Sequence, residues 1–147
     1  MWLNKKAKKE FLNRISKLFD ADTSELEDFE FFVSGKKIYI AASDLKKINL
    51  NKFKVVSIGN YFAKKENGLR LSIEGSQIIG PKALKNVLEI DKKELKSWLS
   101  GEDLPKESKT TGIFLIKFDK DFFGSGKITG KKILNYVPKA RRVKLEI

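Results

Sequence analysis

Hydrophobic residues recur at helical spacing near the start of the chain. The stripe that they form consists of Ala7, Phe11, Leu12, Ile15, Leu18 and Phe19. This spacing predicts an amphipathic helix over residues 5–19, whose opposite side is rich in lysine. A basic amphipathic helix can lie on RNA or on a membrane surface, but the stripe is more simply explained as a docking face for a sheet of the same domain.

Alternating hydrophobic and polar positions follow and predict strands. Residues 29–33 and 37–41 have the pattern of a hairpin around Ser34-Gly35-Lys36. A short helical turn is expected over 44–48 and a strand over 53–62. The pair Asn67-Gly68 predicts a tight turn, because these residues readily adopt positive φ, and a strand over 69–73 comes next.

The middle of the chain predicts two short helices. Gly75 and Gly80 are interpreted as breaks, and Pro81 as the first residue of a helix over 81–89. Asp91 and Glu94 have the spacing of a capping box for a helix over 92–99, which a glycine at 101 would end. Trp98 lies at core spacing in that helix, so we interpret it as a core anchor rather than as a platform for a base.

The last third of the chain predicts a β-meander over residues 112–143 and a closing, half-buried strand over 141–147. The whole order of elements indicates an α+β fold with a mixed, partly closed β-barrel in the second half and short helices at its periphery. We expect a small N-terminal α/β lobe over residues 1–62 and a second domain over 63–147.

The amino-acid composition excludes several classes of functional site. Cysteine and histidine are both absent, which excludes disulfides, zinc–cysteine sites, thiol nucleophiles and Ser-His-Asp triads. The formal net charge of +12 favours a polyanionic partner, although a lysine-rich composition alone can also produce such an excess. No apolar run is long enough for a membrane span or a secretory signal, so a cytoplasmic protein without a membrane partner is expected.

Basic and aromatic residues alternate along the meander. Lys131, Lys132, Lys139, Arg141 and Arg142 cluster around Pro138. Lysine and arginine neutralise phosphate, and aromatic rings offer stacking faces to unpaired bases. The alternative is a solvated basic edge that prevents strand aggregation. The segment Gly124-Ser125-Gly126-Lys127 lacks the longer loop and following helix of a phosphate-binding P-loop, so no nucleotide cofactor is expected.

The second half of the chain also resembles a known module. The resemblance rests on residues 66–71, 81–84, 99–102, 112–117 and 124–127, and on the segment Asn135-Tyr136-Val137-Pro138-Lys139-Ala140-Arg141-Arg142. In this order they are similar to the RNA-binding PUA-like domain at the C-terminus of Sun-type RNA cytosine-C5 methyltransferases. The resemblance implies a compact β-barrel that holds structured RNA, here without the catalytic domain.

These observations predict a non-catalytic RNA-binding protein without a metal or cofactor. Its partner would be ribosomal or transfer RNA, in ribosome biogenesis and ribosomal RNA processing, or in tRNA modification as the targeting partner of a separate RNA methyltransferase or ribosome-assembly factor. The residues expected at the RNA are Arg70, Lys82, Lys127, Lys131, Lys132, Tyr136, Lys139, Arg141 and Arg142, with Phe123 as a second aromatic candidate. The alternative is an adaptor whose basic surface docks on an acidic protein.

Overall fold

The computed structural model describes residues 1–47 and 58–145. Within these ranges the α-helices are α1 (Lys5–Phe19), α2 (Ile73–Ile79) and α3 (Lys92–Leu99). The same ranges contain the 3₁₀ turns η1 (Ser24–Asp28), η2 (Ser43–Lys47), η3 (Gly80–Lys82) and η4 (Lys139–Arg141).

The strands form two sheets. The first sheet is antiparallel, in the order β1 (Phe29–Ser34), β2 (Lys37–Ala42), β3 (Asn60–Lys65) and β4 (Leu69–Leu71). The second has the order β5 (Val87–Glu89), β7 (Gly112–Phe118), β8 (Asp121–Ile128), β9 (Lys132–Asn135) and β6 (Leu104–Pro105). Only the β5–β7 pair in this part of the chain is parallel, so the second sheet is mixed. The α+β class and the mixed half-barrel are confirmed.

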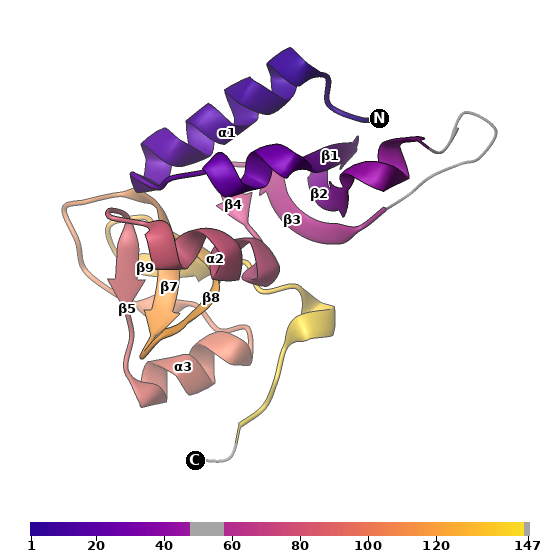
Figure 1. Ribbon diagram of the computed structural model, residues 1–147. Helices are drawn as coiled ribbons and strands as arrows, with labels where there is room; N and C mark the ends of the chain where they lie inside the picture. The colour runs from indigo at the N-terminus through magenta and orange to yellow at the C-terminus, as the bar shows by residue number, and fades with distance from the viewer. Residues whose placement is uncertain (48–57, 146–147) are drawn as a thin grey trace.

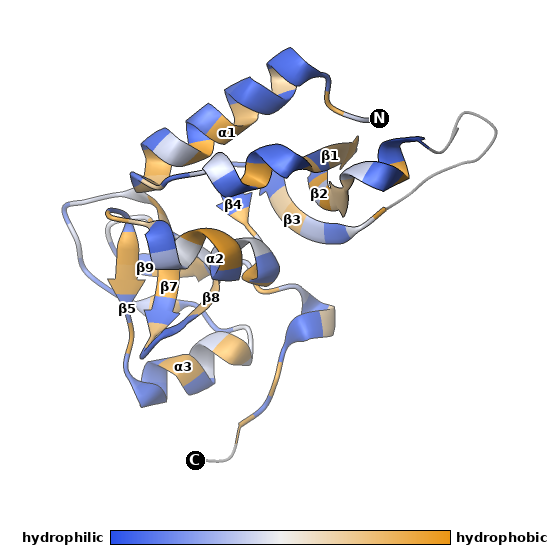
Figure 2. Ribbon diagram, in the orientation of Figure 1, coloured by the Kyte–Doolittle hydropathy of each residue, from blue (hydrophilic) through white to orange (hydrophobic). Residues whose placement is uncertain are grey.

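Helix α1 covers one face of the first sheet (Figure 1). Asn4 caps it, because its side-chain oxygen accepts a hydrogen bond from the Ala7 N–H. The apolar stripe packs on the sheet, and the Phe11 ring lies 5.2 Å from that of Phe31 and 6.0 Å from that of Phe62. Polar residues alternate with the apolar ones along α1 (Figure 2). Both the helix over 5–19 and its docking stripe are confirmed.

The hairpin predicted around Ser34-Gly35-Lys36 is confirmed as β1 and β2. The strand expected over 53–62 falls partly outside the described residues, and β3 in the described part runs from Asn60 to Lys65. It therefore crosses the expected domain boundary after residue 62, and the first sheet continues to Leu71 of β4. The division into domains at that residue stays a prediction.

The helix predicted over residues 81–89 is wrong. Helix α2 precedes it and includes Gly75, where a Cβ would clash with the Phe62 carbonyl oxygen. The Leu84 N–H donates to the Phe19 carbonyl, and the Asn86 side chain donates to the Leu18 carbonyl. This segment thus satisfies the open carbonyls at the end of α1, and β5 follows it.

Helix α3 is confirmed with its capping box. The Asp91 side chain accepts from the Glu94 N–H, and the Glu94 side chain accepts from the Asp91 N–H. Trp98 is completely buried beneath the second sheet, and its ring N–H donates to the Phe123 carbonyl at 2.8 Å. The tryptophan is therefore the core anchor expected from its spacing.

The meander over residues 112–143 is confirmed as β7, β8 and β9, but the closing strand over 141–147 is not formed in its described part. Residues 142–145 have no strand structure, and positions 146–147 lie outside the described residues. The Val143 N–H instead donates to the Leu99 carbonyl at 2.7 Å, at the end of α3. A free carbonyl at the C-terminal end of α3 thus accepts the hydrogen bond that a strand would have donated to its neighbour.

The described residues include no helix that is both long enough and apolar enough to cross a membrane.

Candidate nucleic-acid interface

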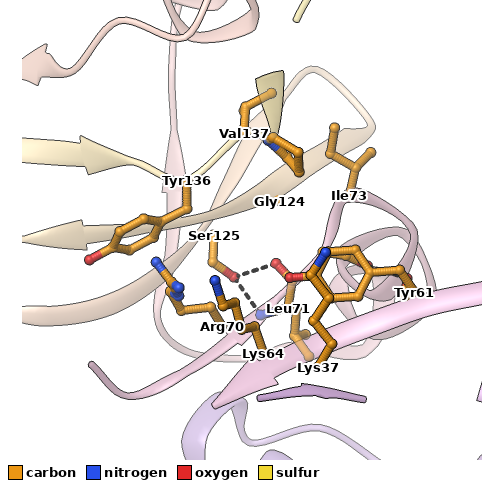
Figure 3. A pocket seen from close by; sticks show the side chains of 12 residues that line it. Lys37, Tyr61, Lys64, Arg70, Leu71, Ile73, Gly124, Ser125, Tyr136 and Val137 are labelled. Atoms are coloured by element: carbon orange, nitrogen blue, oxygen red, sulfur yellow. Dashed lines mark hydrogen bonds between the residues drawn. The ribbon is translucent and has the colours of Figure 1, made fainter. Parts of the chain in front are cut away.

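A pocket of about 210 Å³ lies where the two sheets meet, between β3 and β4 on one side and β8 and the segment after β9 on the other (Figure 3). We call it the junction pocket. The side chains in its wall that carry the argument below are Lys37, Tyr61, Lys64, Arg70, Ser125 and Tyr136. The wall is therefore cationic and aromatic, and it is assembled from both halves of the chain.

Ser125 fastens the two sheets together at the base of the junction pocket. Strand β4 is the edge of the first sheet, and its Leu71 N–H and C=O have no strand partner on that side. The Ser125 hydroxyl accepts from the Leu71 N–H at 2.9 Å and donates to the Leu71 C=O at 3.0 Å. One buried hydroxyl thus satisfies both backbone groups of an edge strand.

Position 124 favours glycine because of its backbone conformation. Its φ of +83° lies in the left-handed region that favours glycine. Its N–H turns toward α2 and donates to the Ser76 hydroxyl at 2.8 Å. Position 126 favours glycine for a different reason, because a Cβ there would come 2.8 Å from the Trp98 ring.

Arg70 and Tyr136 form the centre of the junction pocket. The guanidinium carbon lies 3.8 Å from the centre of the tyrosine ring, which is stacking distance. Arg70 is only 9% exposed, and its Nη2 lies 3.5 Å from the Glu66 carboxylate. Among the described residues its buried Nε has no hydrogen-bond partner. The guanidinium is therefore held in place without all its donors being used.

Glu66 is surrounded by cations. Its carboxylate lies 2.8 Å from Lys64 Nζ, 3.5 Å from Arg70 Nη2 and 3.7 Å from Lys36 Nζ. The hydrogen bond from Lys64, and then the charge of Lys36, hold the pKa of Glu66 below its usual range. A single ionised carboxylate faces three cations here, so this side of the junction pocket keeps a positive excess.

Tyr61 contributes an aromatic wall. Burial raises the pKa of its hydroxyl above the ordinary value of 10.0. The ring lies 6.0 Å from that of Tyr39, and Lys37 Nζ lies 5.2 Å from its centre. Tyr61 therefore stays neutral at physiological pH, with a cation next to its ring.

The strands of the second sheet bring together two of the predicted lysines. Lys127 on β8 is the register partner of Leu134, which lies two positions from Lys132 on β9. Partner residues share a face, so Lys127 and Lys132 lie on the same side of the second sheet. Lys132 is exposed and pairs with Asp103 at 3.2 Å. Lys131 precedes β9 and is exposed.

The other predicted residues lie at three different places. Lys139 and Arg141 are exposed on η4, where Arg141 forms an ion pair with Glu74 of α2. Arg142 turns back toward the end of α3, with its Nε 3.4 Å from the Val137 carbonyl. Lys82 lies in η3, which follows the C-terminal end of α2, and pairs with Glu25 at 2.8 Å, whereas the Glu74 partner of Arg141 lies in the first turn of α2.

The structure therefore joins Arg70 to Tyr136 and places Lys127 and Lys132 on the same side of the second sheet, but it does not gather all nine predicted residues into one cluster. Their role at RNA stays a prediction. Sequence reasoning did not select Lys37, Tyr61 and Lys64, which the junction pocket includes. The sequence signal for these three residues is the alternation of polar or aromatic residues with buried ones along β2 and β3. That alternation was interpreted only as the pattern of a strand.

The described residues contain no group of three or more His, Cys, Asp or Glu side chains placed to hold a metal ion.

The fold defined above is that of PUA domain proteins. The chain superposes on the structure of a conserved PUA domain protein from Thermoplasma acidophilum with a TM-score of 0.62, over 96% of each chain and with 12% sequence identity. That likeness covers both sheets, so it includes the N-terminal part as well as the second half.

Sequence comparison shows which PUA domains the second half of the chain is similar to. Residues 85–143 match the family described as Methyltransferase RsmF PUA domain. The chain is also 28% identical over 75 residues to ribosomal RNA small subunit methyltransferase F from Aeromonas salmonicida (strain A449). That match spans 50% of this chain and only 16% of the methyltransferase. The chain thus carries a PUA-like domain, and the matched family is named for the PUA domain and not for the catalytic domain of those enzymes.

Proposed function

We propose that this protein binds RNA without catalysing a reaction on it, through exposed lysines in the second half of the chain. The observation that carries the proposal is the match of residues 85–143 to a PUA domain of an RNA methyltransferase family. Lys127, Lys131, Lys132 and Lys139 all lie within that matched segment. PUA domains serve as RNA-binding modules, and lysines on such a module supply the phosphate contacts that dominate affinity.

The ion pairs indicate which cations contribute most. Arg141 and Lys132 each have an acidic neighbour, so part of their charge is already compensated. Among the described residues no carboxylate lies within ion-pair distance of Lys127, Lys131 or Lys139. These three lysines release the most counterion when they meet phosphate, and we expect them to dominate the salt dependence of binding.

The proposed biological role follows the matched relative. That protein is named a ribosomal RNA small subunit methyltransferase, so ribosomal RNA is the first RNA to test. We place this protein in the cytoplasm, in ribosome biogenesis or as the targeting partner of an RNA-modifying enzyme that acts on ribosomal or transfer RNA. Either role needs a module that holds structured RNA while another protein acts on it.

The test is charge reversal at two of the unpaired lysines. The double variant Lys131→Glu/Lys139→Glu should lower affinity for a ribosomal RNA stem–loop by about tenfold or more, and should reduce the slope of log K against log salt by about 2. Both side chains are exposed, so the fold should be unaffected. Fluorescence anisotropy over a series of salt concentrations measures both quantities.

The matched control is Lys6→Glu/Lys9→Glu on the exposed side of α1, which changes the net charge by the same amount. If the control weakens binding as much as the test variant, the interaction depends on net charge and not on Lys131 and Lys139. Unchanged affinity in the test variant would refute the proposal for these lysines.

The adaptor alternative lacks the feature that would favour it. Exposed apolar area on α1 would favour an adaptor, and Phe11, Leu12, Ile15 and Phe19 of that helix are buried.

A further inference from the structure

The first sheet has two faces of different character. One face, with Phe31 and Phe62, is covered by α1. We call the opposite side the outer face. Register places Tyr39 beside Tyr61 and Lys37 beside Lys64 on this side, because partner residues in neighbouring antiparallel strands point the same way.

Arg70 extends the outer face to the edge of the sheet, because it is the register partner of Lys64 on β4. The outer face thus presents two tyrosines followed by three cations across three strands. Lys37, Tyr61, Lys64 and Arg70 also line the junction pocket, so the two features are continuous.

The two tyrosines are not core residues. The described chain has two hydrophobic core clusters, and neither Tyr39 nor Tyr61 belongs to either of them. Both rings are half-buried, with their centres 6.0 Å apart. Rings held on a sheet at this exposure are pre-organised platforms, because the strands fix their positions before a ligand arrives.

The cations next to the rings are suited to a phosphate chain. Lys37 Nζ lies 5.2 Å from the Tyr61 ring centre, and Lys64 meets Glu66 at 2.8 Å. Arg70 is nine-tenths buried, and its Nε has no partner in the described part of the chain. The guanidinium lies at the pocket wall, stacked on Tyr136, and so supplies a fixed positive charge and N–H donors suited to a phosphate.

We propose that the outer face and the junction pocket together bind a single-stranded segment of RNA. Bases stack on Tyr39 and Tyr61, while the phosphates of the same segment meet Lys37, Lys64 and Arg70. This inference rests on the proposed RNA-binding function. It adds a second contact surface within residues 37–70, outside the segment 85–143 that matches the PUA domain family.

Single-stranded RNA fits this surface better than a duplex or an acidic peptide. Stacking requires unpaired bases, which a duplex does not offer, and a peptide of glutamates has charge but no flat rings. The alternation of rings and cations on neighbouring strands matches a chain in which bases and phosphates alternate. Polyglutamate is therefore the informative competitor.

The test uses the full chain and a fluorescent oligouridylate without secondary structure. The variant Tyr39→Ala/Tyr61→Ala should weaken its binding by about tenfold or more, as the loss of stacking at each ring predicts. The variant Tyr39→Phe/Tyr61→Phe keeps both rings and should bind as tightly as the unmodified protein. Circular dichroism compares the folding of both variants.

A second pair of variants tests the cations without altering a ring. Lys37→Gln/Lys64→Gln should weaken oligouridylate binding and reduce its slope of log K against log salt by about 0.7–1.4, because each phosphate contact contributes about 0.7 and the ion pair with Glu66 already compensates part of the charge of Lys64. The matched control is Lys6→Gln/Lys9→Gln on α1, which removes the same charge on the other side of the first sheet and should leave the slope unchanged.

The outcomes separate this inference from the proposed function. If the outer-face variants bind oligouridylate normally while Lys131→Glu/Lys139→Glu still loses the stem–loop, the inference is wrong and the proposed function stands. If polyglutamate displaces oligouridylate as effectively as unlabelled oligouridylate does, the surface recognises charge alone and the inference is also wrong. If no RNA of either kind binds, both fail.

Discussion

Removal of the Ser125 hydroxyl should loosen the connection between the two sheets. Ser125 is 3% exposed, and its hydroxyl bonds both the backbone N–H and the backbone C=O of Leu71, on the side of β4 that faces away from β3. The change Ser125→Ala deletes one oxygen and keeps the side chain small. It leaves a buried N–H and a buried C=O of β4 without the partner that now satisfies them.

The magnitude follows from those two bonds. A hydrogen bond inside a protein contributes about 0.5–1.5 kcal/mol net, so losing two should lower the free energy of unfolding by about 2 kcal/mol. With a urea m-value of about 2 kcal/mol/M, the midpoint should fall by about 1 M. Relaxation of β4 would also displace Arg70, which precedes Leu71 on the same strand.

Urea unfolding followed by tryptophan fluorescence measures this change, because Trp98 is completely buried and becomes exposed on unfolding. The matched control is Ser100→Ala, which removes a single hydroxyl bond, of 2.8 Å to the Ser97 carbonyl, at a half-buried position. The control should lower stability by less than about 1 kcal/mol. A loss below about 0.5 kcal/mol in Ser125→Ala itself would show that Ser125 does not hold the sheets together.

Three further predictions follow from single contacts. Gly126→Ala should lower the free energy of unfolding by about 1–3 kcal/mol in the same urea assay, because its Cβ would come 2.8 Å from the Trp98 ring. Lys64→Ala should raise the pKa of Glu66 toward 4.5 in an NMR titration, because the Lys64 hydrogen bond is the largest cause of its lowering. An unchanged pKa would contradict that cause. Tyr61→Phe should remove a step above pH 10.0 from the absorbance titration of tyrosinate, because burial raises the pKa of this tyrosine.

The direction of each pKa shift determines how the stability of the protein changes with pH. The pKa of Tyr61 is raised in the folded protein, so its contribution to stability is complete below pH 10.0 and is lost as the pH rises through the folded value. The pKa of Glu66 is lowered, so its contribution is present above pH 4.5 and is lost as the pH falls through the folded value.

The sequence by itself determined the elements whose signals are local. Helix α1, the first hairpin and helix α3 were predicted close to their observed bounds, because periodicity, a capping box and turn residues act within a few positions. The meander was predicted over 112–143, but its last strand ends at Asn135. The motifs of the second half also indicated a PUA-like domain, which the family match bears out. Trp98 was placed in the core for the same reason, since its spacing in α3 is a local signal.

Only the tertiary structure decided the elements that depend on distant partners. Gly75 resembles a helix break in sequence, yet it lies inside α2 at a position where β3 passes too close to leave room for a side chain. Residues 84 and 143 were assigned to a helix and a strand, but their N–H groups donate to carbonyls at the ends of α1 and α3. The same holds for the junction pocket, where Arg70 meets Tyr136 and Ser125 meets Leu71. These pairs are far apart along the chain, and packing of the two sheets brings them together, so no local pattern could predict them.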